Sequence, residues 1–342
     1  MRARLDVDLS AFAANLRRIR QTVAPARHLL VVKDDAYGHG LEPVVRTAMR
    51  EGVEWFGTFD VPTAQEVRRV AGPRARIVAW TVYGPEDVDA ALSGDIDLGL
   101  GSRDGVRMLI ERARALGIPG RVHLKIDTGL HRNGIRPEEW VDAVAEATLA
   151  EASGALAVAG VWSHLAESSD ADDDASRAQF LTAAAAFGRR PVIRHLAASA
   201  ASFARPEFRF DMVRVGAYAY GIRPAGGPSD DSLGIRSIAT LVATVAGVAD
   251  GMARLDIGSL DGLDSRLAGR MEAGTPCGPR RIRAISETSA LVDSWPGAMA
   301  GQEVALLGAG APATATDLAE ALGTIGEQVV LRISPRLPRR YL

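Results

Sequence analysis

LLVVKDDAYGHG (residues 29–40) joins an apolar run to a polar turn that contains two glycines. The first four residues have the composition of a buried strand, and Lys33 follows them directly. A lysine at the carboxyl end of a buried strand is costly to desolvate, so it usually has a chemical role, such as a covalent bond to an aldehyde. Tyr37 and His39 would then line a binding loop. This segment alone leaves open the alternative of a solvated lysine just past an ordinary strand.

Short apolar runs recur eight times, and we expect a strand at each: 29–33, 55–59, 75–80, 96–100, 122–126, 158–163, 192–196 and 212–216. Stretches with helical spacing lie between them, for example at 62–71, 103–116, 137–152 and 174–187. Eight strand and helix units in roughly two hundred residues favour an α/β fold of the (β/α)8 TIM-barrel type. A doubly wound open sheet is the alternative. In a barrel, the active site would lie where the strands end.

The composition changes after Pro224, where Ala-Gly-Gly-Pro-Ser-Asp-Asp (225–231) has the character of a linker. Strand-like runs follow at 237–248, 282–293, 303–307 and 329–333. One helix is expected at 317–322, with Thr316 as its N-cap and Gly323 as its end. We therefore expect two domains: a barrel over residues 9–226 and a mainly β domain over 227–342. Residues 1–8 would join the second domain as a strand.

Composition and charge narrow the class of partner. The chain has 342 residues, of which 47% are hydrophobic, and its formal net charge is -2. No overall field would recruit nucleic acid or an anionic membrane, so we expect a small-molecule partner. Cys277 is the only cysteine, which excludes an intramolecular disulfide and a cysteine-rich metal cluster. We expect no metal site, no signal peptide, no membrane span and a cytoplasmic location.

Polar residues gather at the ends of the expected barrel strands. They are Lys33, Lys125, Asp127, His164, Ser199 and Arg214. Each one alone is weak evidence, because a single histidine is more often part of the core and a single aspartate is more often part of a turn. Six such residues at one mouth of a barrel indicate a site.

Several segments resemble those of the alanine racemases. They are VVKDDAYGHG (31–40), HLKIDTGLHRNGI (123–135), GVWSHLAE (160–167), HLAASAA (195–201), FDMVRVGAYAYGI (210–222) and RISPRLPRRY (332–341). They occur in the family's order and span nearly the whole chain. The resemblance implies a barrel that binds pyridoxal 5'-phosphate (PLP), followed by a β domain. It also implies an enzyme that acts at the Cα of a small amino acid, and a homodimer.

The resemblance implies cofactor roles for five residues around the aldehyde and the phosphate. Lys33 would bind PLP covalently and act as a catalytic base. Tyr37 and Ser199 would hold the phosphate, together with backbone amides near Gly216 and Ala217.

Four further residues would surround the ring of the cofactor. His164 would flank the ring, and Arg132 would bond the phenolic oxygen. Lys125, which family members can carry as a carbamate, would steady Arg132. Arg214 would face the pyridine nitrogen, and because a guanidinium keeps its proton, the ring would be a weaker electron sink than in transaminases.

The chain departs from the family in the β domain. Family members take a second acid/base from a tyrosine in the β domain of the partner subunit, and no such tyrosine is found here. Residues 241–252 run almost directly into 253–262, where the family has a longer hairpin. Ser259 stands in the place of another family tyrosine, and Glu287-Thr288 replaces a Met-Asp pair. His131 is a candidate replacement acid, the alternative being a loop histidine without a role.

Three functions remain open on this basis. Racemization of an amino acid with an unconventional second base is the leading one. A one-base PLP reaction, such as decarboxylation, transamination or retro-aldol cleavage, is the second. The third is a PLP-binding protein without catalytic turnover.

Overall fold

The computed structural model describes residues 3–342, which form two compact units. The barrel unit consists of Ile19–Lys33 and Ala48–Gly216. The sheet unit consists of residues 3–18, Asp34–Thr47 and Ala217–Leu342. The expected domains at 9–226 and 227–342 stay a prediction.

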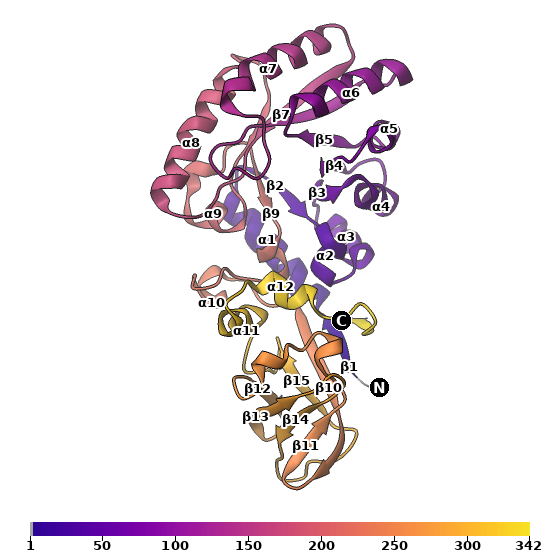
Figure 1. The fold of residues 1–342 in the computed structure, drawn as a ribbon, viewed down its shortest axis with the longest axis vertical. Coiled ribbons are helices and arrows are strands. Elements are labelled where there is room, and N and C mark those ends of the chain that lie inside the picture. Colours follow the sequence, from indigo (N-terminus) through magenta and orange to yellow (C-terminus); the bar gives the residue numbers. More distant parts are fainter. Residues whose placement is uncertain (1–2) are drawn as a thin grey trace. The chain divides into compact units, whose positions relative to one another are not determined.

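Eight parallel strands close into a barrel in the barrel unit (Figure 1). In chain order they are β2 (Arg27–Val31), β3 (Trp55–Asp60), β4 (Arg76–Thr81), β5 (Asp97–Leu100), β6 (Gly120–Lys125), β7 (Leu156–Trp162), β8 (Ile193–His195) and β9 (Met212–Val215). β9 pairs with β2 and closes the ring, with Arg214 opposite Leu29. The (β/α)8 fold class is confirmed, because each expected apolar run overlaps one of these strands.

Helices surround the barrel strands on the outside (Figure 1). They are α4 (Val61–Ala71), α5 (Pro85–Ser93), α6 (Arg103–Leu116), α7 (Pro137–Ala152), α8 (Asp170–Ala185) and α9 (Ser199–Ala204), followed by the 3-10 turn η1 (Pro206–Phe208). α8 begins earlier than expected because Ser169 caps it, its hydroxyl accepting a hydrogen bond from Asp172 N. Two more helices, α1 (Leu9–Val23) and α3 (Leu41–Arg50), run across the boundaries between the units.

Glycines in the barrel strands make room for two tryptophans in the interior. A Cβ at Gly57 would lie 2.7 Å from the Trp80 ring, and one at Gly99 would lie 3.1 Å from the Trp162 ring. The centroids of the two indole rings are 6.1 Å apart. The small residues therefore allow large rings to fill the space inside the barrel.

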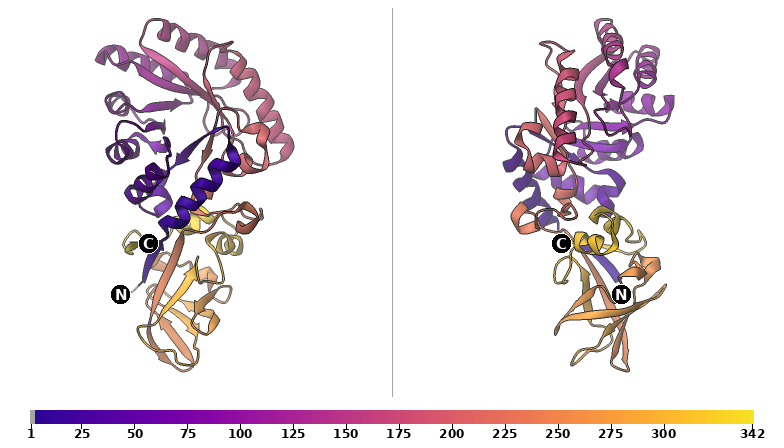
Figure 2. Two further views of the ribbon diagram at one scale, coloured as in Figure 1. Left: turned by 180° about the vertical axis from the view of Figure 1, so that it is seen from behind. Right: turned by 60° about the vertical axis from the view of Figure 1, so that its left-hand side comes forward.

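The sheet unit contains an eight-stranded sheet in the order β11-β14-β13-β12-β15-β10-β1-β16. The strands are β1 (Ala3–Val7), β10 (Ala239–Ala249), β11 (Met252–Leu255), β12 (Glu272–Thr275), β13 (Gly278–Ile285), β14 (Ala290–Asp293), β15 (Glu303–Leu307) and β16 (Arg339–Tyr341). β11 also pairs with β10, so six of the strands form a ring, which Figure 2 shows in orange from two sides. The expected mainly β domain is thus confirmed.

The strand expected at residues 1–8 is β1, which lies between β10 and β16. Residues 1 and 2 fall outside the described residues. β1 is antiparallel to β10 and parallel to β16. Asp8 then caps α1, because its carboxylate accepts hydrogen bonds from the backbone amides of Ser10 and Ala11.

Short helices complete the sheet unit, and two of them correct the sequence predictions. They are α10 (Asp230–Leu233), α11 (Ala315–Leu322), α12 (Gly326–Leu331) and the 3-10 turns η2 (Ala217–Tyr220), η3 (Ser259–Asp261) and η4 (Ser265–Leu267). The strand expected at 329–333 is wrong, since α12 covers most of it and a short apolar run suits both structures. The cap of α11 is Thr314 rather than Thr316, in a capping box with Asp317.

Among residues 3–342, no helix combines the length and apolar character that a membrane span needs.

Candidate active site

The segment α2 (Lys33–Gly38), which follows the first barrel strand, is a left-handed turn. Asp34, Asp35, Ala36 and Tyr37 all have φ between 53° and 56°. This conformation costs L-residues about 1–2 kcal/mol each, so four in a row need strong support from their surroundings. Backbone strain of this kind is concentrated at functional sites. The strained turn directly after Lys33 therefore indicates a functional site at this position.

Local hydrogen bonds within the sheet unit hold this turn. The Asp35 carboxylate accepts from Leu41 N at 2.7 Å, and Asp35 O accepts from Gly40 N at 3.0 Å. His39 Nδ1 donates to Ala36 O at 2.9 Å. Tyr37 is buried, with its ring centroid 4.7 Å from that of Tyr220. Burial raises the pKa of the Tyr37 hydroxyl well above its usual value, so this group acts as a neutral hydrogen-bonding hydroxyl.

Four cations act together on one histidine at the carboxyl ends of the barrel strands. Burial lowers the pKa of His164 well below its usual value, and nearby positive charges lower it further, namely those of Arg214, Arg132, Lys125 and Lys33. The structure thus brings together four of the six residues expected at this mouth, together with Arg132. The acidic neighbours are fewer: Asp127 acts on Lys125, and Glu167 acts on Arg214. An excess of positive charge in a partly buried site favours an anionic ligand.

Arg214, in β9, is buried and fixed by several acceptors. Its Nη2 donates to Ser163 O at 2.7 Å and to Leu196 O at 3.0 Å, and its Nη1 donates to His195 O at 3.0 Å. Nη2 also lies 3.1 Å from His164 Nδ1. Since a guanidinium only donates, this contact favours an unprotonated His164 Nδ1, which would share one of the two Nη2 hydrogens with a carbonyl oxygen. These bonds all use Nη1 and Nη2, which leaves the Nε–H edge for a further acceptor.

Two of the cations lie over the ring of Trp162, at the end of β7. Lys125 Nζ lies 4.6 Å from the ring centroid, and the Arg214 guanidinium carbon lies 5.0 Å from it. Burial, helped by Arg214 and Arg132, lowers the pKa of Lys125 to about 8. Lys125 is therefore partly neutral near neutral pH, which makes its amine more nucleophilic. Lys33 and Lys125 are also the only lysines in the sequence.

The last two barrel strands supply a second group of expected site residues. Ser199 begins α9 after β8, and its hydroxyl accepts a hydrogen bond from Gly216 N, just after β9, at 3.3 Å. In TIM barrels the loops after the seventh and eighth strands frequently form a phosphate site. Ala217 and Tyr37 belong to the sheet unit, so their contribution to such a site stays a prediction.

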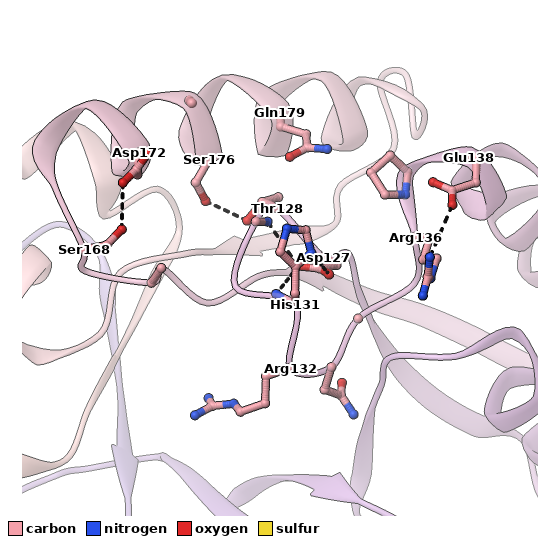
Figure 3. Close-up of a pocket in the computed structure, with 16 residues that line it drawn as sticks. Asp127, Thr128, His131, Arg132, Arg136, Glu138, Ser168, Asp172, Ser176 and Gln179 are labelled. Carbon is pink, nitrogen blue, oxygen red and sulfur yellow. Dashed lines mark hydrogen bonds and ion pairs between the residues drawn. The ribbon is translucent and has the colours of Figure 1, made fainter.

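The loop after β6 holds His131 at the surface of the barrel unit. Its side chain is 81% exposed, and Nδ1 lies 3.0 Å from the Asp127 carboxylate, which also accepts from the backbone amide of His131 (Figure 3). This loop is anchored by Thr128, whose hydroxyl lies 2.7 Å from Ser163 Oγ and 2.6 Å from Ser176 Oγ. The loop therefore holds His131 in position through Asp127, while the His131 side chain is exposed to solvent.

A pocket of about 870 Å³ lies between this loop and α8. His131 and Arg132 line it, and so do Asp172 and Gln179 from α8 (Figure 3). Lys33 and Arg214 are not among its lining residues. The pocket therefore borders the cation cluster through Arg132 and does not contain its centre.

The group of donors fits PLP in three respects. PLP brings an anionic phosphate, an anionic phenolic oxygen and a basic ring nitrogen. The four cations suit the anions, and the Nε–H edge of Arg214 suits an acceptor nitrogen. Lys33 supplies an amine for the aldehyde. Among the described residues, no group of three or more His, Cys, Asp or Glu side chains is arranged to hold a metal ion.

The sequence analysis did not single out Trp162, the ring beneath the cations, or the buried histidines of the barrel. A usable signal was present, because His123 and His195 lie within two of the expected strand runs. A polar side chain inside a predicted barrel strand must find a buried partner. The scarcity of lysine, found only at positions 33 and 125, was a second signal.

In the sheet unit, β10 and β11 are joined by a two-residue turn at Asp250 and Gly251, with φ of 51° and 73°. Positive φ at both central residues is the geometry of a tight hairpin turn, and an Asp-Gly pair suits it well. A separate contact brings together two places where we expected the sequence to depart from the family. Ser259 N donates to Ser286 O, and Leu260 N donates to Glu287 O.

The fold and the site define a class: a TIM-barrel enzyme with a lysine and a fixed arginine at the carboxyl ends of its strands. The model of the N-terminal domain of alanine racemase matches residues 7–224. The alanine racemase of Thermobifida fusca is 36% identical, with 98% of this chain and 96% of that protein covered. That of Beutenbergia cavernae is 34% identical, with 99% and 98% covered. The chain belongs to the alanine racemase family.

Solved structures give the same result. Alanine racemase from a D-cycloserine-producing Streptomyces lavendulae aligns with a TM-score of 0.93 at 34% identity, over 100% of this chain and 97% of that one. A Clostridium difficile alanine racemase in complex with cycloserine aligns with a TM-score of 0.91 at 25% identity, over 100% and 96%. The alignment with the Thermobifida protein spans 372 positions, more than the 342 residues here, so that relative has segments that this chain lacks.

Proposed function

We propose that this protein is a PLP-dependent enzyme that acts at the Cα of a small amino acid, with racemization as the leading reaction. The observation that carries the proposal is the cluster of Lys33, Lys125, Arg132 and Arg214 around His164. Membership in the alanine racemase family over nearly the whole chain supports it. A homodimer and a cytoplasmic location are part of this proposal.

Each residue of the cluster has one task in this proposal. Lys33 would hold PLP covalently, and its Nζ would take or return a proton at Cα on one face of the substrate. Arg214, fixed by the carbonyls of Ser163, His195 and Leu196, would donate to the ring nitrogen without giving up its proton. Bound PLP would supply withdrawal of electrons from Cα, and this withdrawal would be weaker than in transaminases because Arg214 would not protonate the ring nitrogen.

The remaining residues would bind and orient the cofactor. Arg132 would donate to the phenolic oxygen with Lys125 beside it. The lowered pKa of Lys125 is compatible with the carbamate that the family can carry, because only a neutral amine adds carbon dioxide. His164 would flank the ring. Ser199 and Gly216 would contribute to the phosphate site, and so would Tyr37 and Ala217.

A one-base reaction is the second candidate, favoured by the Asp250-Gly251 turn and by the tyrosines of the chain. Of the five tyrosines, only Tyr341 falls in residues 227–342. For racemization, the second base would then have to come from another residue type. His131 is our candidate, because its loop fixes it through Asp127 while its ring faces solvent.

Borohydride reduction of the PLP-loaded protein tests the cofactor assignment. A stable PLP adduct is expected on Lys33, and the only other primary amines are Lys125 and the N-terminus. Peptide mass analysis separates these three sites. A protein that stays colourless with PLP and gives no adduct at Lys33 would refute the proposal.

Incubation with L-alanine and with D-alanine in deuterium oxide tests the reaction. Racemization predicts that both enantiomers take up deuterium at Cα and interconvert. A one-base reaction predicts exchange with retained configuration, or release of carbon dioxide or an aldehyde from other substrates. A non-catalytic PLP protein predicts no change in cofactor absorbance with any amino acid.

A further inference from the structure

A line of buried polar side chains crosses the interior of the barrel unit to Arg214. It consists of Asp97 in β5, His123 in β6 and His195 in β8. His195 Nδ1 lies 3.4 Å from Arg214 Nη1, His195 Nε2 lies 2.9 Å from His123 Nδ1, and His123 Nε2 lies 3.4 Å from Asp97 Oδ2. All three side chains are at most 1% exposed. Water therefore has little access to these bonds, and their partners are the ones named here.

The position of each proton in this line follows from Arg214. A guanidinium has only N–H donors, so His195 Nδ1 must be the unprotonated nitrogen of its ring. The proton of His195 then lies on Nε2 and is donated to His123 Nδ1. The proton of His123 in turn lies on Nε2 and is donated to the Asp97 carboxylate. Any other arrangement sets two donors against each other in a buried site.

The far end of the line is fixed by charge. Asp97 accepts from Arg76 Nη2 and from Arg121 Nε, both at 2.6 Å. The carboxylate thus has donors on both oxygens and keeps its negative charge. A buried, fully paired acceptor of this kind sets the direction in which the imidazoles point their protons.

The barrel also leaves space for these bonds. A Cβ at Gly160, in β7, would lie 2.3 Å from His123 Nδ1, and so any side chain there would push this ring away from His195. His195 is stacked on Trp162, with ring centroids 5.7 Å apart and an interplanar angle of 1°. The two rings of the line are therefore held by shape as well as by hydrogen bonds.

We propose that Asp97, His123 and His195 form a directional hydrogen-bond relay that fixes the orientation of Arg214. His123 and Asp97 are positioning residues, because they act on the bound cofactor only through Arg214. This inference rests on the proposed function for its effect on PLP, whereas the proton positions hold whether or not PLP binds. The relay keeps the Nε–H edge of Arg214 directed at one place.

Nitrogen NMR of ¹⁵N-histidine-labelled protein, with and without PLP, tests the proton positions directly. His123 and His195 should each show a protonated Nε2 and an unprotonated Nδ1. Variants of each histidine assign the signals. A proton on Nδ1 of either ring would overturn the relay.

Two substitutions of His123 separate polarity from packing in the PLP-loaded enzyme. In H123Q the amide oxygen can still accept from His195 and the amide nitrogen can still donate to Asp97. In H123L the volume is similar, but both bonds are lost. We expect H123L to shift the pH at which the cofactor absorbance changes by roughly 0.5–1 unit, and H123Q to keep the wild-type profile. We also expect H123L to lower kcat more than it raises KM.

The outcomes of this experiment are distinct. Equal behaviour of H123L and H123Q would mean that His123 only fills space, which overturns the relay. If H123L does not fold, the NMR measurement on the wild-type protein decides. D6N is the matched control, because Asp6 is also buried between two arginines but lies in the sheet unit, and its removal should leave the absorbance profile unchanged. If no PLP binds at Lys33, the proposed function fails while the NMR result still tests the relay.

Discussion

Each unit of this protein buries one aspartate between two arginines, and the two clusters differ in what else they contact. In the barrel unit, Asp97 pairs with Arg76 and Arg121 and also touches a histidine. In the sheet unit, Asp6 pairs with Arg4 and Arg340. Arg4 continues to Glu303, which is half exposed. A buried aspartate between two arginines is therefore connected to the predicted site in the barrel unit and to the surface in the sheet unit.

The difference shows that a buried ion pair has no fixed meaning by itself. Such a pair is weak evidence for stability, because desolvation offsets most of the attraction. What the Asp97 cluster adds is a connection through polar side chains to Arg214. The Asp6 cluster joins β1 and β16 within the sheet. A comparison of the two clusters therefore separates the effect of the connection to Arg214 from the effect of the buried ion pairs.

Replacement of Lys33 should have the largest effect on activity, and it tests the predicted site of the barrel unit. K33A should remove the covalent PLP adduct and lower turnover by at least roughly 10³-fold, because both the amine and the base are lost. Absorbance and peptide mass analysis after borohydride reduction measure the adduct. K125R is the control and should keep the adduct on Lys33. An adduct that persists in K33A on Lys125 would contradict the assignment.

Neutralising each buried aspartate should cost stability in both units. D97N and D6N should each lower the free energy of unfolding by about 2–4 kcal/mol, because in each cluster two arginines lose the buried carboxylate between them. Urea denaturation measures both. The comparison fails if D97N costs no more stability than D89N, which breaks a partly exposed pair with Arg112.

Acid should weaken the Asp97 cluster within a defined range. Burial alone would raise the pKa of Asp97, but the hydrogen bond from His123 and the charges of Arg121 and Arg76 lower it to about 2. A folded-state pKa below the unfolded one gives stability that is present above about pH 4 and lost as the pH falls toward 2. Its size is about 2 kcal/mol. The loss of stability between pH 4 and 2 should shrink in D97N, and an unchanged acid transition would contradict this.

Titration of the lysines sharpens the description of the barrel mouth. Burial, with Arg214 and Arg132 nearby, lowers the pKa of Lys125 to about 8, so it should change protonation about two pH units earlier than an ordinary lysine. Carbon NMR of ¹³C-lysine-labelled protein, in buffer freed of carbon dioxide, should show one midpoint near pH 8. Only two lysine signals are expected, and K125R assigns them. Two midpoints above pH 10 would contradict the cation cluster.

The turn between β10 and β11 should give the smallest effect. G251A places a side chain at φ of 73° and should cost about 1 kcal/mol in the free energy of unfolding. The cofactor absorbance should stay as in the wild type, because this turn carries no proposed site residue. A loss of cofactor binding that exceeds the loss of stability would place the turn in the site after all.

Much of the fold could be predicted from local patterns. Apolar runs with helical stretches between them gave all eight barrel strands, because a strand buried on both faces needs a nearly continuous apolar sequence. The errors lay in the sheet unit. The run at 282–293 is two strands, β13 and β14, with a turn at 286–289, and 329–333 is mostly helix. Short apolar runs without a periodic signal suit a strand or a helix equally.

The site could be predicted in part. The residues that end strands, such as Lys33 and Arg214, were found because parallel strands all end at one face of a barrel. Asp97 begins β5 and His123 lies within β6, where position along the chain gives no hint of a partner. Their roles depend on which strands are neighbours and on the small residue at Gly160.

The sequence by itself determined the family, the barrel and the residues at its mouth, because strand length, apolar content and motif order are local properties. Only the tertiary structure decided that Asp97, His123 and His195 form one line to Arg214. His123 is 26 positions from Asp97 and 72 positions from His195 in the sequence, yet it lies within hydrogen-bond distance of both. Closure of the barrel sets those contacts, and in a dry interior a donor can face only an acceptor.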